Sequence, residues 1–168
     1  MIIARPAAVE AFVGLGANLE DPLQQVRQAI AELDAIEHTC LLVASSLYRS
    51  APVGYADQPD FINAVAKLQT GLSPRELLDA LHVIENRHSR RRSVRNAPRT
   101  LDLDLLLYGI LVVDEDGLTL PHPRMHERAF VLLPLAEIAP EALLPGHASV
   151  SQLLAQVDRS GVEKLHVA

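Results

Sequence analysis

The chain has 168 residues, 49% hydrophobic and 21% charged, a composition ordinary for a soluble globular protein, and this length fits one domain over residues 1–168. No apolar run approaches the roughly 20 residues that a membrane-spanning helix needs, and the single cysteine, Cys40, excludes an internal disulfide framework and fits a reducing cytoplasm. The net charge of −6 argues against general affinity for nucleic acid. We therefore expect a cytoplasmic monomer with neither nucleic acid nor membrane as a partner.

The first half of the chain predicts three strands and two helices with clear start signals. Asp21 followed by Pro22 is a typical N-cap and first-turn pair, and Ser73 with Glu76 forms a capping box. The expected elements are a strand over 8–16, a helix opening at 21–24, strands over 39–49 and 61–70, and a helix from 73 to about 88. Each helix has one apolar stripe for the core: Leu23, Val26, Ile30 and Leu33 in the first, and Leu77, Leu81 and Ile84 in the second.

The second half predicts a loop, a strand, a hairpin and a helical extension. Residues 87–99 form an arginine-rich loop, residues 99–109 a strand, and residues 110–120 a hairpin around Asp116-Gly117. A last helical region is expected to be broken by Pro134. The order βαββαβ predicts an α+β fold with a ferredoxin-like core, a mainly antiparallel sheet with helices on one face, plus the hairpin and the C-terminal helical extension. The helix-free face is expected to be open for a site.

The segment RTLDLDLLLYG places two acidic side chains on one face of its strand. Because side chains alternate along a strand, its residues divide between two faces: Leu101, Leu103, Leu105 and Leu107 on one, and Thr100, Asp102, Asp104, Leu106 and Tyr108 on the other. An exposed strand would explain the pair without function, but aspartate is depleted in strands, and the all-leucine face suggests a central, well-packed strand. Like charges so close favour a cation between them, and Mg²⁺ prefers oxygen ligands.

Residues 87–99 carry six arginines and no acidic residue, which favours a local anion site over a general basic surface. Arginine binds phosphate with a planar fork, and a polyphosphate would be neutralised by arginines and Mg²⁺ together. A solvated loop is the alternative. No P-loop is present, and GLGANL, at residues 14–19, lacks the third glycine of a dinucleotide fingerprint and is better interpreted as a tight turn after the first strand.

Histidines add candidates whose roles the spacing alone leaves open. His122 and His126 have a spacing found in some zinc sites, but prolines flank His122, and an anion contact beside Arg124 and Arg128 is the better interpretation. His82 and Glu85 share one face of the second helix, which alone would indicate only a surface pair.

Together these segments resemble a known family, the 6-hydroxymethyl-7,8-dihydropterin pyrophosphokinases of folate biosynthesis. The matching segments are VGLGANL, SSLYRSAPVG, DQPDFINAV, PRTLDLDLLLYG and LPHPRMHERAFVLLPLAEIAP, which cover most of residues 11–140. The resemblance implies a ferredoxin-like core and an ATP-dependent diphosphotransferase. It also implies that the enzyme uses two Mg²⁺ ions to transfer a pyrophosphoryl group from ATP to the pterin's hydroxymethyl oxygen, releasing AMP.

The resemblance also assigns roles to individual residues. As metal ligands it implies Asp102 and Asp104, which with Arg90 and Arg92 would be the catalytic residues. For ATP binding it implies His82, Glu85, Arg90, Arg92, Arg99, His122 and Arg128. For the pterin pocket it implies Ser50, Val53, Phe61, Asn63 and Phe130. Within that pocket the two phenylalanines would sandwich the ring, and the asparagine would read its hydrogen-bonding edge.

The chain departs from the family pattern in three places. It has no Trp and carries Asn96-Ala97 before the P-R-T segment, where relatives often have one; His82 replaces a common Gln; and Pro123 stands where an aromatic residue often follows the histidine. Two other functions remain open from the residues alone: a non-catalytic module that binds RNA or a small effector through its basic loop, and a metal-dependent phosphohydrolase that uses the aspartate pair.

Overall fold

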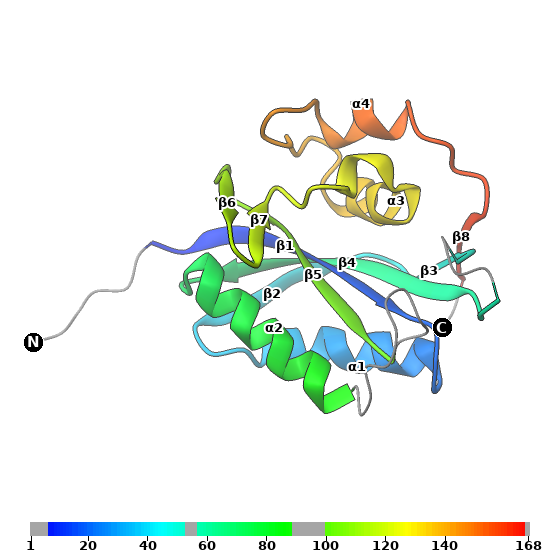
Figure 1. The fold of residues 1–168 in the computed structure, drawn as a ribbon, viewed down its shortest axis with the longest axis horizontal. Helices are drawn as coiled ribbons and strands as arrows, with labels where there is room; N and C mark the ends of the chain where they lie inside the picture. The colour runs from blue at the N-terminus through cyan, green and yellow to red at the C-terminus, as the bar shows by residue number, and fades with distance from the viewer. Residues whose placement is uncertain (1–6, 53–56, 89–99, 167–168) are drawn as a thin grey trace, which may run out of the picture.

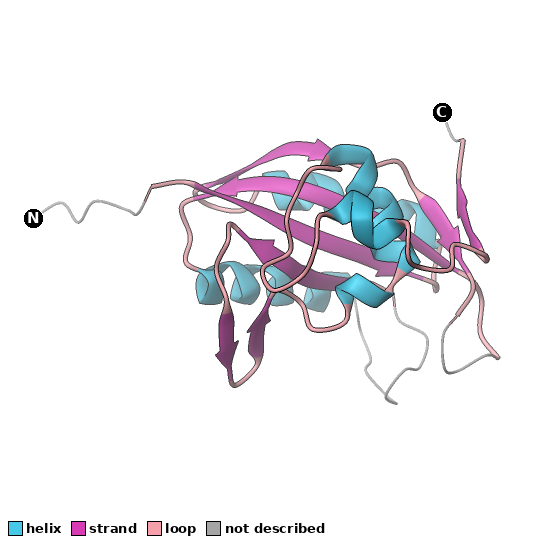
Figure 2. Cartoon of the chain, turned by 90° about the horizontal axis from the view of Figure 1, so that it is seen from above, coloured by secondary structure: helices cyan, strands magenta, loops and turns pink. Residues whose placement is uncertain are grey.

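A six-stranded antiparallel sheet forms the centre of the computed structural model, which describes residues 7–52, 57–88 and 100–166 (Figure 1). The strands, in hydrogen-bonded order, are β5 (Asp102–Tyr108), β1 (Val9–Ala17), β4 (Phe61–Thr70), β3 (Tyr48–Ser50) and β8 (Val162–Lys164), while β2 (Thr39–Ala44) pairs with the far end of β4. A separate hairpin of β6 (Val113–Glu115) and β7 (Leu118–Leu120) projects beside β5 (Figure 2). This arrangement confirms the predicted α+β fold.

Helices cover both faces of the sheet. On one face lie α1 (Pro22–Asp34) and α2 (Pro74–His88), and on the other lie α3 (Ala129–Ile138) and α4 (Val150–Leu154), preceded by a short 3₁₀ turn at Met125–Glu127 (Figure 1). The expectation that helices occupy one face is therefore correct for the core only, because the C-terminal extension folds back onto the second face. No helix in the described ranges is both long and apolar enough to cross a lipid bilayer.

The starts of α1 and α2 form as the sequence predicts. The Asp21 carboxylate accepts a hydrogen bond from the Gln24 N–H at 3.4 Å. Ser73 Oγ accepts from the Glu76 N–H at 3.1 Å, and the Glu76 carboxylate accepts from the Ser73 N–H at 2.9 Å, which completes the capping box. Each cap satisfies backbone donors that have no partner within the first helical turn.

Two hydrophobic cores result, one on each face of the sheet. The core under α1 and α2 contains fully buried residues of both helical stripes, including Val26, Leu33 and Leu77. The core under α3 and α4 is built around Val65 and Leu132. A sheet buried on both faces holds its strands rigidly, which is a suitable base for side chains that must keep fixed positions.

Strand β5 contains a β-bulge that moves its last residues to unexpected faces. Val13 pairs with Leu105 but Phe12 pairs with Leu107, so Leu106 is an extra residue opposite β1. Beyond the bulge the alternation is reversed. Leu107 therefore joins the core under α3, and Tyr108 joins the core under α1 and α2, where its hydroxyl donates to the Leu72 carbonyl at 2.5 Å. The predicted faces are correct up to Leu106 and wrong for Leu107 and Tyr108.

Three further elements differ from the sequence prediction. The strand predicted over 39–49 is broken at Ser45, whose hydroxyl accepts the Val65 N–H at 2.9 Å in place of a strand carbonyl. Helix α3 continues through Pro134 although a proline removes one helical hydrogen bond, because fully buried Leu132 and Leu135 hold it on the sheet. Strand β8, which follows α4, was not predicted from the sequence.

Candidate active site

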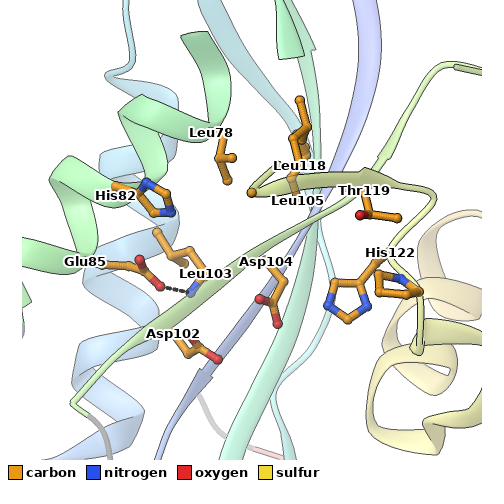
Figure 3. A pocket seen from close by; sticks show the side chains of 12 residues that line it. Leu78, His82, Glu85, Asp102, Leu103, Asp104, Leu105, Leu118, Thr119 and His122 are labelled. Atoms are coloured by element: carbon orange, nitrogen blue, oxygen red, sulfur yellow. Dashed lines mark hydrogen bonds between the residues drawn. The ribbon is translucent and has the colours of Figure 1, made fainter. Parts of the chain in front are cut away.

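A pocket of about 340 Å³ lies at the free edge of β5, where α2 and the β6–β7 hairpin approach that strand (Figure 3). The residues that line it come from these three elements and the segment after the hairpin: Leu78, His82 and Glu85; Asp102, Leu103, Asp104 and Leu105; Gly117, Leu118 and Thr119; and His122 and Pro123. Five predicted site residues thus share one pocket, although they are separated by up to 40 positions in the sequence.

The two aspartates point to the same face of β5, as the alternation predicts. Asp102 pairs with Gly16 and Asp104 pairs with Gly14, and both carboxylates are half-buried in the pocket wall (Figure 3). Within the described ranges no group of three or more His, Cys, Asp or Glu side chains is placed to hold one metal ion. A pair of carboxylates fits Mg²⁺, which keeps several of its waters and often takes only one or two protein carboxylates beside substrate phosphates.

Strand β5 is at the edge of the sheet and not at its centre as predicted, because its only strand partner in the described structure is β1. One free backbone donor of this edge is capped by a side chain: the Glu85 carboxylate, only 3% exposed, accepts a hydrogen bond from the Leu103 N–H at 2.8 Å (Figure 3). Leu103 lies between the two aspartates. Glu85 therefore fixes the segment of β5 that carries both carboxylates, a contact for which the sequence gives no signal.

His122 closes the pocket on the side opposite α2 (Figure 3). Its backbone N–H donates to the Leu106 carbonyl at 2.9 Å, which ties the post-hairpin segment to β5. Burial lowers the pKa of His122 to about 4, and the positive charges of Arg128 and Arg124 act in the same direction, while Asp102 opposes them. Nδ1 accepts from the Arg124 N–H at 3.3 Å, so the neutral ring carries its proton on Nε2 and can donate it to an anion.

Among the described residues predicted for the pterin, Ser50, Phe61 and Asn63 lie outside this pocket but on the same face of the sheet as the aspartates. Asn63 Nδ2 donates to Ser50 Oγ at 2.6 Å, and Phe61 is the strand partner of Ser50. Phe130 lies in α3, which packs on β3 and β4. The centroid of its ring is 5.6 Å from Arg128 Cζ, a cation–π contact. The structure thus brings Ser50, Phe61 and Asn63 together on two paired strands.

One row of paired residues connects the two groups. Gly16 of β1 pairs with Asp102 on one side and with Asn63 on the other. Directly paired residues of antiparallel strands face the same side, so the Asp102 and Asn63 side chains rise from one face with only a glycine between them. Two strand spacings separate β5 from β4, a distance of about 10 Å.

Sequence reasoning did not predict how the glycines of the first strand are placed. Gly14 and Gly16 lie inside β1, and neither has a positive φ, so the turn predicted from GLGANL is not made by its glycines; the chain turns just after β1, where Glu20 and Asp21 have positive φ. Their two-residue spacing within an apolar run was the available signal for a strand face without side chains. Leu118 and Thr119 were also missed, since nothing in the hairpin sequence indicates that β7 lies beside β5.

Four predicted site residues fall outside the described residues: Val53, Arg90, Arg92 and Arg99. Their roles remain predictions from the resemblance. Arg128 is described and precedes α3, where its charge reaches His122. His82 lies one turn before Glu85 in α2, is exposed, and lines the pocket.

Comparison with known proteins shows which family the chain is similar to. Residues 12–140 match the family model described as 7,8-dihydro-6-hydroxymethylpterin-pyrophosphokinase. The 2-amino-4-hydroxy-6-hydroxymethyldihydropteridine pyrophosphokinase of Haemophilus influenzae is 45% identical over 148 residues, which are 88% of this chain and 92% of that protein. The Pseudomonas aeruginosa protein of the same name is 46% identical over 154 residues, 92% of this chain and 95% of that one.

Solved structures support the fold. A Plasmodium falciparum HPPK-DHPS structure with pterin and p-hydroxybenzoate has a TM-score of 0.74 at 12% identity, covering 99% of this chain and 46% of that one. An HPPK-DHPS structure in complex with substrates has a TM-score of 0.76 at 12% identity, covering 96% of this chain. The chain spans less than half the length of these solved chains, 46% and 47% respectively.

Proposed function

The chain belongs to the 7,8-dihydro-6-hydroxymethylpterin-pyrophosphokinase family, and from this premise we propose which of its residues carry out the family's reaction. In this reaction the pyrophosphoryl group of ATP is transferred to the hydroxymethyl group of 6-hydroxymethyl-7,8-dihydropterin, giving the pterin diphosphate and AMP. The observation that supports our assignment best is the shared sheet face, on which the aspartate pair of the pocket and the predicted pterin residue Asn63 are two strands apart.

We assign the nucleotide to the pocket at the β5 edge. Asp102 and Asp104 would hold two Mg²⁺ ions, which when bound polarise phosphate oxygens and neutralise developing charge. The Nε2–H of neutral His122 would donate to a phosphate oxygen, and Arg128 would add positive charge on the same side. On the α2 side, Glu85 would keep the aspartate-bearing strand in place, and His82 would contact the nucleoside.

We assign the pterin to the neighbouring part of the same face. The Asn63 amide has donors and acceptors for the ring's hydrogen-bonding edge, and Ser50 holds that amide in one orientation. Phe61 and Phe130 would supply aromatic surfaces for the flat ring. The hydroxymethyl group would then point from β4 towards β5, where the proposed nucleotide site would place the ATP phosphates.

We further propose that the protein works as a cytoplasmic monomer that binds no nucleic acid. The single cysteine fits a reducing compartment, and the negative net charge disfavours a nucleic-acid partner. Sedimentation that gives a mass near 18.3 kDa would support the monomer.

The direct test is to incubate the purified protein with ATP, Mg²⁺ and hydroxymethyl-dihydropterin and to quantify the products. We expect AMP and pterin diphosphate in equal amounts. Free phosphate or pyrophosphate without pterin diphosphate would indicate a phosphohydrolase and would refute the proposal. RNA binding without turnover would favour the non-catalytic module.

Substitutions test the assignment of the metal ligands in the same assay. We expect Asp102→Asn and Asp104→Asn to lower turnover by at least about 100-fold, since metal stabilisation of the transition state contributes several kcal/mol. Asp114→Asn, which changes an exposed carboxylate in the hairpin strand β6, is the matched control and should retain normal turnover. Turnover within threefold of wild type in both site variants would exclude the metal role.

A further inference from the structure

Gly16 lies directly beside the side-chain amide of Asn63, the residue proposed to bind the hydrogen-bonding edge of the pterin. A Cβ atom built on Gly16 would lie 3.2 Å from Asn63 Oδ1 and would meet no other atom of the described chain within 4 Å. The contact is tighter than side chains normally allow. A methyl group here would therefore press on the amide oxygen of Asn63 and on little else.

The amide cannot easily yield to such pressure because its other end is held. Asn63 Nδ2 donates to Ser50 Oγ at 2.6 Å, and both residues are buried, with 5% and 3% of their surfaces exposed. The sheet order β1–β4–β3 places Gly16 on one side of Asn63 and Ser50 close to its other side. Because an amide group is planar, moving Oδ1 away from β1 also moves Nδ2 and strains the bond to Ser50.

We infer that Gly16 is a positioning residue for the pterin: by lacking a side chain it lets the Asn63 amide keep the orientation that Ser50 imposes. This inference rests on the proposed function, in which Asn63 binds the pterin edge. A buried amide that is turned out of line leaves ligand donors and acceptors poorly paired, which weakens binding. Gly16 would thus act on pterin affinity through Asn63 and have no direct effect on the nucleotide.

Gly14 provides a matched control on the same strand and the same face. A Cβ atom on Gly14 would lie 3.4 Å or more from the side chain of Leu106, which is ordinary contact, and its three nearest atoms all belong to Leu106 and none to Asn63. Gly14→Ala therefore makes the same chemical change two residues away without touching the amide.

The experiment measures equilibrium binding of pterin and of ATP, each alone, by calorimetry. We expect Gly16→Ala to weaken pterin binding about tenfold, with ATP affinity unchanged, and Gly14→Ala to alter neither. In ligand-free protein, the side-chain amide NMR signals of Asn63 should shift in Gly16→Ala and stay in place in Gly14→Ala. A loss of pterin affinity below fivefold in Gly16→Ala would overturn the inference.

A double variant separates positioning from a general effect on the fold. In an Asn63→Ala background the clashing oxygen is gone, so adding Gly16→Ala should weaken pterin binding by less than twofold. If Gly16→Ala alone lowers the melting temperature or prevents folding, the double variant should recover it. An equal loss of affinity in both backgrounds, or no recovery of the fold, would also overturn the inference.

Wild-type measurements keep this result distinct from the proposed function. If the wild-type protein neither binds nor pyrophosphorylates the pterin, the proposed function itself is wrong. If the wild type does both and Gly16→Ala binds pterin as the wild type does, only the role of Gly16 is wrong.

Discussion

His122 illustrates how the fold sets the charge of a single residue in the site. Burial lowers its pKa to about 4, with Arg128 contributing in the same direction, so the imidazole is neutral at physiological pH. An unfolded chain would have a histidine pKa near 6.5. Between about pH 6.5 and pH 4 the unfolded state therefore binds more protons, and the folded state loses stability as the pH falls through this window.

We expect NMR titration of the ligand-free protein to give His122 a midpoint near pH 4. Arg128→Gln removes a nearby positive charge that disfavours the imidazolium, so it should move the midpoint upward, towards 6.5. Arg49→Gln, which changes an exposed arginine on β3, should leave it in place. A wild-type midpoint at or above pH 6 would contradict the structural explanation.

At the residue scale, the sequence was sufficient to predict those side-chain positions that depend only on local backbone geometry. Asp102 and Asp104 share a face because the two-residue period of a strand is fixed by its backbone. Glu85 is different: its partner, the Leu103 N–H, is free only because β5 lies at the sheet edge, which is a property of the whole topology. Gly16 likewise needs Asn63, 47 positions away, to acquire a role.

At the scale of elements, α3 is joined to the strand that carries Ser50 by one carboxylate. Glu137, near the end of α3, accepts hydrogen bonds from Ser46 N–H at 3.0 Å, Ser46 Oγ at 2.9 Å and the Tyr48 hydroxyl at 2.6 Å. Burial alone would raise the pKa of Glu137, but these bonds bring it below its usual value. The same helix carries Phe130, two turns earlier and on the same helix side.

We expect Glu137→Gln to lower the free energy of unfolding by about 1 kcal/mol at pH 7, because a charged acceptor of several hydrogen bonds is lost, while solvent around this exposed residue limits the effect. A carboxylate whose pKa is lowered by folding stabilises the protein above its unfolded pKa, and this contribution disappears as the pH falls through the folded pKa. The difference between wild type and variant should therefore shrink in acid. Urea unfolding at several pH values measures it.

Glu141→Gln changes an exposed carboxylate just beyond α3 and is the control, expected to stay within about 0.5 kcal/mol of wild type. A Glu137→Gln protein as stable as this control at pH 7 would show that the three hydrogen bonds do not hold α3.

Helices and strands could be predicted where their sequence signals are local. The predictions failed where pairing between distant strands determines the structure. The caps of α1 and α2 involve residues three positions apart, so Asp21 and Ser73 were sufficient to predict both helix starts. The bulge in β5 arises only when that strand pairs with β1, and the break at Ser45 depends on Val65 of β4. Strand β8 is three residues long and exists because β3 offers an edge to it.

At the scale of the whole molecule, the two faces of the sheet differ in how completely helices cover them. The face under α1 and α2 is a continuous core. The other face is divided, with α3 and α4 covering Val65 and Leu106, while the row from Asp102 through Gly16 to Asn63 joins the two proposed substrate sites. The C-terminal extension, whose position the sequence did not predict, would thus form one boundary of the proposed pterin site.

Under the proposed function, Mg²⁺ would link nucleotide binding to the stability of the whole protein. If ATP binds at Asp102 and Asp104 through metal ions, the folded state gains binding energy only when both ligand and metal are present. A ligand at 100 times its dissociation constant stabilises a protein by about 2.7 kcal/mol, and for a chain of this length each kcal/mol raises the melting temperature by about 2–4 °C. We therefore expect saturating ATP with Mg²⁺ to raise the melting temperature by about 5–10 °C.

The same ATP concentration with excess EDTA should produce little shift, because two carboxylates facing an unscreened triphosphate repel it. The variant Asp102→Asn, measured by the same thermal scan, should lose most of the Mg²⁺-dependent part while melting near the wild-type temperature without ligand. An equal shift with and without Mg²⁺ would mean that ATP is held by cationic side chains alone. In that case Asp102 and Asp104 would not bind the nucleotide through a metal ion, and their position on one strand face would need another explanation.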